Sequence, residues 1–447
     1  MDTIYWQPSA EAINSANMAL FRKHINQHYQ LNLKDYGQLH QWSTDHAPDF
    51  WSQFWDFFGI KASHKGERIL LDGEQMPGAK WFPDARLNFA ENMLWRKDEH
   101  TALIATCEHN DIRKFSYKEL NEKVELFSAW LKANDVSVGD RVAGYLPNSA
   151  EAMIAALAVA RIGAIWSSCS PDFGVNAVCD RFGQIEPKVL LTAAAYRYSG
   201  KTSYCLDNTM EIVGRINSIK HVIVVSHLLS IDLNELSIPE GILLWPDILE
   251  AAIDLPVPEF AQLPFDHPLY ILFSSGTTGA PKCIVHGVGG TLLQHMKEHH
   301  LHVGLRPEDN FFYSTTCGWM MWNWLLSGLG TGCTLTLFDG SPFRLKAQKL
   351  FRLTEDLSIT VLGTSARMIS AWKKLKLRPN ERFNLSSLRT ILSTGSPLLP
   401  NSFDYVYTHI KKDLCLSSIS GGTDIISCFA LGNPILNVHR GELQCLG

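Results

Sequence analysis

The stretch FSSGTTGAPK, residues 273–282, follows directly on the apolar run YIL at 270–272. The apolar run predicts a strand that ends where the small residues begin. Glycines and small hydroxyl residues let the backbone approach a polyphosphate, and their N–H and O–H groups can point at its oxygens. Lys282 adds a positive charge. The spacing differs from GxxxxGK[ST], so we predict a phosphate-binding loop of another kind than Walker A.

On both sides of this loop, short β-branched runs alternate with amphipathic segments. From about residue 101 the runs are TALIAT, RVAGYL, KVLLTA, HVIVVS, YILFSS, TLTLFD, TVLGT and RTILST. This alternation predicts an α/β fold with mostly parallel sheets covered by helices. The proline-rich segment LPVPEFAQLPFDHP, 255–268, predicts the connection between two such units. We therefore expect two α/β subdomains within residues 101–447.

The first hundred residues have another pattern. Aromatic residues recur at roughly helical spacing in 1–60, for example Phe50, Trp51, Phe54, Trp55, Phe57 and Phe58. We expect residues 1–100 to form a helical extension packed on the larger body. The longest apolar stretch, 152–166, is interrupted by Arg161 and is too short for a bilayer. It predicts a buried helix running into a strand, and no membrane span.

Composition limits the kinds of partner. The 447 residues are 46% hydrophobic, 19% charged and 11% aromatic, which is typical of a folded globular chain. A formal charge of −5 gives no reason to expect nucleic acid or an anionic membrane surface, so small molecules are the expected partners. The ten cysteines are scattered without a CxxC pair, and the N-terminus lacks a signal-peptide pattern, which favours the cytoplasm. The oligomeric state is left open.

Four motifs, in order, carry a resemblance to a known family. SSGTTGAPK at 274–282 is similar to the phosphate loop of adenylate-forming enzymes. TTCGWMMWNW at 315–324 resembles the acyl-pocket motif, and STGSPL at 393–398 resembles the stretch that lines adenine. ISGGTDI at 419–425 resembles the segment that meets the α-phosphate and Mg²⁺. Three longer stretches resemble acetoacetyl-CoA synthetases: 77–94, 167–174 and 283–302. The likeness extends over the chain from about Trp6.

The resemblance implies the large domain of an adenylate-forming enzyme, with two α/β subdomains and a smaller β subdomain near the C-terminal end. The family often has Lys at Ala280, Gly at Cys283 and, in many members, Glu at Asp424. Aspartate can also hold Mg²⁺. The sequence ends at GELQCLG, where a ribose-binding Asp, a hinge and a small domain with a catalytic Lys are expected. We therefore expect this chain alone to be incomplete or weakly active.

The implied reaction joins acetoacetate and CoA at the expense of ATP, with Mg²⁺, giving acetoacetyl-CoA, AMP and pyrophosphate. The catalytic residues implied are Thr423, Asp424 and Lys282, with Asp424 holding Mg²⁺. The implied ATP-binding residues are Ser274, Ser275, Gly276, Thr277, Thr278, Gly279, Lys282, Gly395, Ser396, Pro397, Gly422 and Thr423.

The acyl and CoA sites are also implied by the resemblance. Related acetyl-CoA synthetases close the acyl pocket with a tryptophan where this chain has Gly421, which favours a longer acid. The implied walls are Trp319, Met320, Met321 and Trp322, although a Met/Trp cluster is also typical of plain core. Arg197 and Lys201 fit a basic loop for the CoA phosphates, or else solvated surface charge.

Three other interpretations stay open. A chain without the small domain could bind only nucleotide or acyl-adenylate. The substrate could be another short-chain acid. His295, Glu298 and His299 form HMKEH, which matches the HxxEH pattern of some zinc peptidases and suggests a metal-dependent hydrolase.

Overall fold

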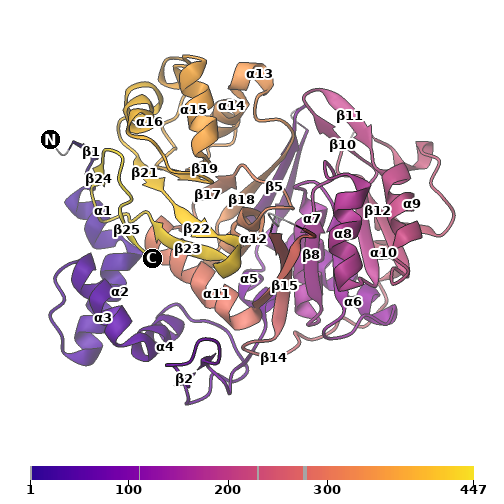
Figure 1. The fold of residues 1–447 in the computed structure, drawn as a ribbon, viewed down its shortest axis with the longest axis horizontal. Coiled ribbons are helices and arrows are strands. Elements are labelled where there is room, and N and C mark those ends of the chain that lie inside the picture. Colours follow the sequence, from indigo (N-terminus) through magenta and orange to yellow (C-terminus); the bar gives the residue numbers. More distant parts are fainter. Residues whose placement is uncertain (1–2, 110, 229–230, 275–278) are drawn as a thin grey trace.

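Two seven-stranded sheets form the centre of the molecule (Figure 1). The computed structural model describes residues 3–109, 111–228, 231–274 and 279–447. Both sheets are parallel except for one edge strand each, β16 and β6, which run antiparallel to their neighbours. The predicted α/β class with mostly parallel sheets is confirmed.

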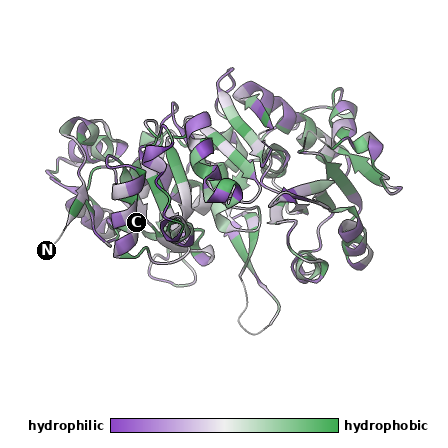
Figure 2. Ribbon diagram, turned by 90° about the horizontal axis from the view of Figure 1, so that it is seen from above, coloured by the Kyte–Doolittle hydropathy of each residue, from purple (hydrophilic) through white to green (hydrophobic). Residues whose placement is uncertain are grey.

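The first sheet has the strand order β13-β12-β9-β7-β8-β15-β16. Its strands are β7 (Arg141–Tyr145), β8 (Ile165–Cys169), β9 (Val189–Ala193), β12 (His221–Val225), β13 (Ile242–Leu244), β15 (Pro268–Ser274) and β16 (Lys282–Gly287). The helices of this part of the chain are α6 (Tyr117–Ala133), α7 (Ala150–Arg161), α8 (Val175–Ile185), α9 (Leu206–Arg215) and α10 (Trp245–Ala251), with the short η1 (Leu233–Glu235). In Figure 2 the strands are largely hydrophobic and the surrounding helices carry hydrophilic residues, as expected of a buried parallel sheet.

The second sheet has the order β21-β20-β19-β17-β18-β5-β6. Its strands are β5 (Thr101–Cys107), β6 (Ile112–Ser116), β17 (Asn310–Tyr313), β18 (Thr334–Asp339), β19 (Val361–Ser365), β20 (Thr390–Thr394) and β21 (Cys415–Ser418). The helical segments here are α12 (Met320–Ser327), η3 (Gly328–Thr331), α13 (Arg344–Ala347), α14 (Lys349–Asp356), α15 (Ala366–Lys374), η4 (Pro379–Glu381), α16 (Pro400–Tyr405) and η5 (Val406–Ile410).

The connection between the two units is not at 255–268, so that prediction was wrong. The chain starts the second sheet with β5 and β6, builds the first sheet, and returns through α11 (Val288–Lys297) and the π-helical η2 (Glu298–Val303). The proline segment instead joins α10 to β15 within the first unit. Proline has no N–H for a sheet ladder, and side chains anchor the segment: Arg161 Nε donates to the Pro258 carbonyl at 2.8 Å.

Residues 4–93 form the predicted helical segment and a few short strands. They include β1 (Ile4–Trp6), α1 (Ala10–Ser15), α2 (Asn17–Tyr29), α3 (Tyr36–Asp45), α4 (Ala47–Phe57), β2 (Leu70–Leu71), β3 (Lys80–Trp81), β4 (Arg86–Leu87) and α5 (Phe89–Met93). The rings of Phe21, Phe50 and Phe54 pack together, with the Phe21 and Phe50 centroids 5.6 Å apart. β4 pairs with β14 (Leu263–Pro264), which ties this segment to the first unit.

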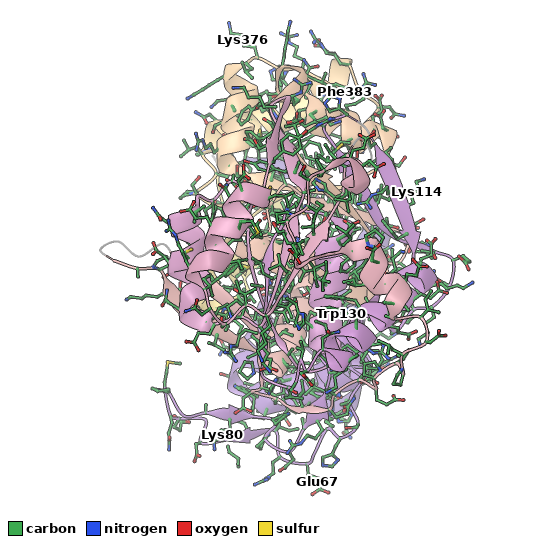
Figure 3. All side chains as sticks on the ribbon, turned by 90° about the vertical axis from the view of Figure 1, so that its right-hand side faces the viewer. Glu67, Lys80, Lys114, Trp130, Lys376 and Phe383 are labelled. Carbon is green, nitrogen blue, oxygen red and sulfur yellow. The ribbon has the colours of Figure 1, made fainter. Side chains whose placement is uncertain are left out.

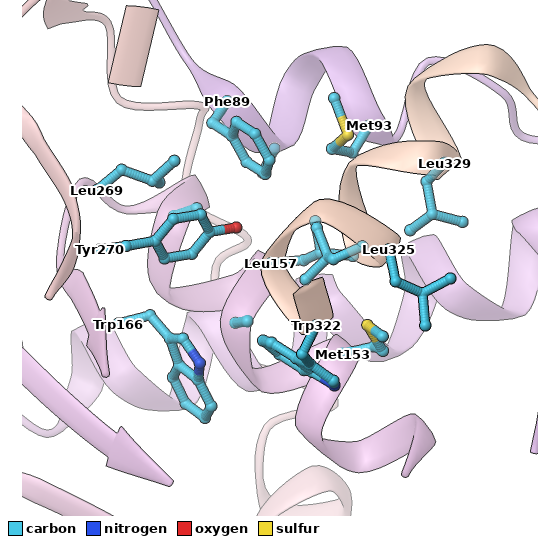
Figure 4. Close-up of a cluster of buried hydrophobic side chains, with 14 of the residues drawn as sticks. Phe89, Met93, Met153, Leu157, Trp166, Leu269, Tyr270, Trp322, Leu325 and Leu329 are labelled. Carbon is cyan, nitrogen blue, oxygen red and sulfur yellow. The ribbon is translucent and has the colours of Figure 1, made fainter. Parts of the chain in front are cut away.

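The apolar stretch at 152–166 becomes the buried helix α7 and the start of β8, as predicted. Figure 4 shows Met153 and Leu157 of this helix beside Trp166, Tyr270 and Trp322. Within the described residues, no helix has both the length and the apolar character needed to cross a membrane. By contrast, charged side chains such as Glu67, Lys114 and Lys376 point outward at the periphery in Figure 3.

The C-terminal part forms the smaller β region that was expected. β22 (Ser420–Gly422), β23 (Ser427–Leu431) and β25 (Cys445–Leu446) make a three-stranded sheet, with η6 (Thr423–Ile425) between the first two. β24 (Val438–His439) pairs with β1 near the other end of the chain. A separate hairpin consists of β10 (Ala195–Tyr198) and β11 (Lys201–Tyr204).

Candidate functional site

The main cavity, of about 570 Å³, lies beyond the carboxyl ends of β20 and β21. Ligands of α/β proteins commonly bind at this edge of a sheet. Its lining combines three of the predicted motifs: Trp319, Met320, Met321, Thr394, Gly395, Ser396, Pro397, Leu398, Ser418, Ile419, Ser420, Gly421, Gly422, Thr423, Ser427, Cys428, Gly441 and Leu443. The fold therefore brings the predicted adenine, acyl and α-phosphate segments around one space.

A second cavity, of about 270 Å³, adjoins the first and shares Trp319, Met320 and Thr423 with it. Its other lining residues are Ser168, Cys169, Phe173, Arg181, Leu272, Phe273, Ser274, Gly318 and Asp424. The first residue of the predicted phosphate loop and the predicted metal ligand thus border the same cavity. Thr423 stands between this cavity and the larger one.

The predicted phosphate loop begins where β15 ends, at Ser274. Ser274 pairs with Lys282 across β15 and β16, so residues 275–281 connect two antiparallel strands. Four predicted ATP-binding residues, Ser275, Gly276, Thr277 and Thr278, lie outside the described residues. Gly279 and Lys282 are exposed.

Two buried histidines hold the turn that carries Thr423 and Asp424. His286 Nε2 donates to the Thr423 carbonyl at 2.8 Å, and His295 Nε2 donates to the Ile426 carbonyl at 2.7 Å. Burial lowers the pKa of both imidazoles, that of His295 to about 4. A neutral imidazole has one N–H, so His295 Nδ1 accepts from the Ser327 hydroxyl at 2.7 Å. The turn is thereby fixed at both ends.

Glu298 supports the neighbouring strand from behind. Its carboxylate is fully buried and accepts from Ser427 Oγ at 2.5 Å, Cys428 N at 3.0 Å and Trp324 Nε1 at 2.6 Å. Ser427 and Cys428 both line the main cavity. Glu298 therefore positions one wall of the site without entering it.

These contacts argue against the zinc interpretation of HMKEH. In His299, as in His295, Nε2 donates to a backbone carbonyl, here that of Trp324 at 2.8 Å. A nitrogen that carries a proton cannot bind a metal ion. Within the described ranges, no group of three or more His, Cys, Asp and Glu side chains is arranged to hold a metal. In the structure these three side chains support neighbouring backbone and hydroxyl groups, which does not favour the zinc alternative.

Gly421 lines the main cavity through its backbone. A Cβ at this position would collide with the Ser427 carbonyl oxygen and lie 2.9 Å from the Cys428 Cα. The side-chain direction of Gly421 therefore points into β23, not into the cavity. A tryptophan cannot stand here without displacing that strand.

The expected acyl wall divides into two parts. Trp319, Met320 and Met321 line the main cavity, and Trp319 is 66% exposed. Trp322 is completely buried, and its indole N–H donates to Asn148 Oδ1 at 3.1 Å. Figure 4 shows it beside Trp166 in the core. Its position gives no support to a role as a cavity wall.

The predicted CoA residues lie on the β10–β11 hairpin, outside the lining of both cavities. Arg197 is half-buried and Nε donates to Thr202 Oγ1 at 3.1 Å, whereas Lys201 is exposed. The hairpin tip is anchored because the backbone N–H groups of Ser199 and Gly200 donate to the Glu108 carboxylate at 2.6 and 2.7 Å.

Comparisons with known proteins agree with this arrangement. The AMP-binding enzyme family model matches residues 91–417, and the acetyl-coenzyme A synthetase N-terminus model matches 36–93. An acetoacetyl-CoA synthetase of Gallus gallus is 44% identical over 446 residues, which are 99% of this chain and 67% of that protein. An acetoacetyl-coenzyme A synthetase of Rhizobium meliloti (strain 1021) is 46% identical over 439 residues, 98% of this chain and 67% of that protein.

A solved structure gives the same result. The acetoacetyl-CoA synthetase from Streptomyces lividans superposes with a TM-score of 0.92 at 40% identity, covering 100% of this chain and 68% of that one. The chain thus spans about two thirds of the length of the relatives it matches.

Proposed function

The chain belongs to the AMP-binding enzyme family, among its acetoacetyl-CoA synthetases, and we propose that it serves the ATP-dependent ligation of acetoacetate to CoA. The products are acetoacetyl-CoA, AMP and pyrophosphate. The observation that carries the proposal is the meeting of three motifs around one cavity, with the turn Thr423–Ile425 between that cavity and the phosphate loop.

The reaction has two steps. In the first, a carboxylate oxygen of acetoacetate attacks the α-phosphorus of ATP, the bond from that phosphorus to the β-phosphate oxygen breaks, and pyrophosphate leaves. In the second, the CoA sulfur attacks the acyl carbon, the bond to the AMP oxygen breaks, and the thiol proton passes to solvent. Neither step needs a protein nucleophile. The protein has to align two anions and offset charge on phosphate oxygens.

The described residues divide this task. Gly395, Ser396 and Pro397 lie along adenine in the main cavity, and Gly395 has a positive φ of 87° that glycine adopts without strain. Thr423 meets the α-phosphate where the two cavities adjoin. Ser274 and Lys282 serve the β- and γ-phosphates from the two ends of the loop, together with Ser275, Thr277 and Thr278.

The residues present fit Mg²⁺. Asp424 is exposed and lines the second cavity, as Ser274 does, and Mg²⁺ in nucleotide sites is usually bound by one or two carboxylates, substrate phosphates and water. A bound Mg²⁺ neutralises phosphate charge and orients the polyphosphate. Asp424 is held for this task because its turn is fixed by His286 and His295.

Acyl selection is proposed for Trp319, Met320 and Met321, which line the main cavity; Trp319 and Met320 also line the second cavity, as Thr423 does. Because Trp319 is exposed, its ring is available to pack against a bound acid. For CoA, we propose that Arg197 and Lys201 bind the phosphates, with the β10–β11 hairpin fixed by Glu108.

The test measures the two steps separately with residues 1–447. Exchange of labelled pyrophosphate into ATP reports the first step, and thioester formation from CoA reports the second. We expect exchange that depends on acetoacetate and is weaker with acetate, and we expect Thr423→Val to reduce it. ATP binding without any acid-dependent exchange would favour a chain that only binds nucleotide. Exchange with another short acid but not with acetoacetate would overturn the proposed substrate.

A further inference from the structure

Arg181 of α8 is a charged residue of the site that the sequence motifs do not include. Its guanidinium lies 5.0 Å from the ring centroid of Phe173 and 5.9 Å from that of Phe273. Both rings line the second cavity, as Arg181 itself does. Nη1 donates to the Ala177 carbonyl at 2.7 Å, one turn earlier in the helix. Two aromatic contacts and one hydrogen bond therefore hold the guanidinium at the cavity wall.

Among the described residues, the charge of Arg181 is not neutralised by an ion pair. In the part of the chain that the structure describes, no carboxylate forms an ion pair with it, whereas Arg113, Arg161 and Arg389 pair with Glu151, Glu125 and Asp309. Removing a charge from water is costly, so a partly buried guanidinium gains from an opposite charge nearby. An unpaired guanidinium facing a cavity favours an anionic ligand.

The same cavity shows which part of an anion reaches Arg181. Ser274 begins the phosphate loop, Asp424 is the proposed Mg²⁺ ligand, and Thr423 separates this cavity from the one proposed for adenine. A nucleotide whose α-phosphate is at Thr423 extends its β- and γ-phosphates into the second cavity. A guanidinium presents a planar set of N–H donors that matches two phosphate oxygens.

We propose that Arg181 binds the pyrophosphate portion of MgATP and the pyrophosphate that the first step releases. This inference rests on the proposed function, because it assumes the nucleotide orientation given above. The CoA diphosphate has the same chemistry, but the residues proposed for it lie on the β10–β11 hairpin, outside the second cavity. The geometry therefore favours the nucleotide.

The experiment compares three probes by calorimetry: AMP, inorganic pyrophosphate with Mg²⁺, and CoA. AMP reaches only Thr423, so it reports the main cavity without Arg181. We expect Arg181→Gln to weaken pyrophosphate binding about ten- to a hundredfold, to weaken MgATP similarly, and to change AMP affinity less than about twofold. Arg181→Lys keeps the charge without the planar donors and should lie between Arg181→Gln and the wild type.

Arg215→Gln is the matched control. Arg215 lies on the adjacent α9, donates to Asn176 Oδ1 at 2.7 Å, and lies outside the lining of both cavities. It should leave all three affinities unchanged.

Several results would overturn the assignment: unchanged pyrophosphate affinity in Arg181→Gln, equal losses for AMP and pyrophosphate, a loss confined to CoA, or no pyrophosphate binding by the wild type. Failure of the proposed function would give a different result. The wild type would show no acetoacetate-dependent pyrophosphate exchange, while its pyrophosphate binding would still depend on Arg181.

Discussion

The two edges of the site are built in opposite ways. The back wall, which consists of His286, His295 and Glu298 behind the Thr423 turn and β23, is buried and bonded to the backbone or hydroxyl groups it supports. The loop edge, Gly279 and Lys282, is exposed, and a Cβ on Gly279 would meet no atom of the described residues within 4 Å. The back wall fixes the geometry of the site, whereas the polar groups of the loop edge are exposed and available to a ligand.

The largest expected effect separates two glycines that both belong to the predicted site. Gly421→Ala places a methyl group against the Ser427 carbonyl and the Cys428 Cα, so we expect it to destabilise the fold by roughly 3 kcal/mol. Gly279→Ala has open space around it and should change stability by less than about 0.5 kcal/mol. Urea unfolding measures both, and equal effects would remove the distinction between the two edges.

The next effect concerns Glu298. Glu298→Gln turns one acceptor oxygen into a donor, which then faces either the Ser427 hydroxyl and the Cys428 N–H or the Trp324 indole N–H. Leaving buried polar groups unpaired should cost about 2.5 kcal/mol of unfolding free energy. Glu99→Gln is the control, since the Glu99 side chain is 74% exposed and its ion pair with Lys118 contributes little. A Glu298→Gln protein as stable as Glu99→Gln would show that the carboxylate is not a support.

The back wall is also where the sequence left a second interpretation open. The spacing of His295, Glu298 and His299 correctly places them on one turn of helix, but it does not say what that face meets. The partners are β23 and the carbonyls of Trp324 and Ile426, which are distant in sequence. Only tertiary packing distinguishes a scaffold from a metal site with the same spacing.

The side-chain directions at Gly421 and Trp322 could not be predicted from the sequence for a related reason. β22 is three residues long and its pairing with β23 shifts between Ser420 and Gly421, so alternation along the strand does not define the direction of Gly421. For α12, Met320, Met321 and Trp322 are consecutive, and the helix turns the third into the core. The strand before the phosphate loop was predicted correctly because a run such as YILFS depends on local pattern alone.

A third prediction tests the loop edge. Lys282→Ala should weaken MgATP binding about thirtyfold, or roughly 2 kcal/mol, because an ammonium–phosphate contact is lost. The unfolding free energy should stay unchanged, since Lys282 is exposed. Cys283→Ala on the same strand is the control and should bind ATP like the wild type. Calorimetry measures the MgATP affinity and urea unfolding measures the stability. A loss of stability that matches the loss of affinity would mean that Lys282 is structural.

The last effect concerns acid, which should act on the buried histidines at and near the back wall and spare the loop edge. Burial lowers the pKa of His295 and His300 to about 4 and that of His302 to about 3, below the ordinary value of 6.5. The folded chain therefore binds fewer protons than the unfolded chain between these values. Stability is present above pH 6.5 and is lost as the pH falls toward 4, by about 1.4 kcal/mol per pH unit for each such histidine.

Substituting His300 removes one of these titrating groups and leaves the back wall, His286, His295 and Glu298, intact. Its ring stacks on Phe58 with centroids 4.4 Å apart, and its buried Nδ1 has no hydrogen-bond partner among the described residues. His300→Phe keeps the stacking, so we expect unfolding measured from pH 7 to 4.5 to show a slope shallower by about 1.4 kcal/mol per pH unit. An unchanged slope in His300→Phe would mean that His300 is not held neutral, and the acid sensitivity would then fall on His295, His299 and His302.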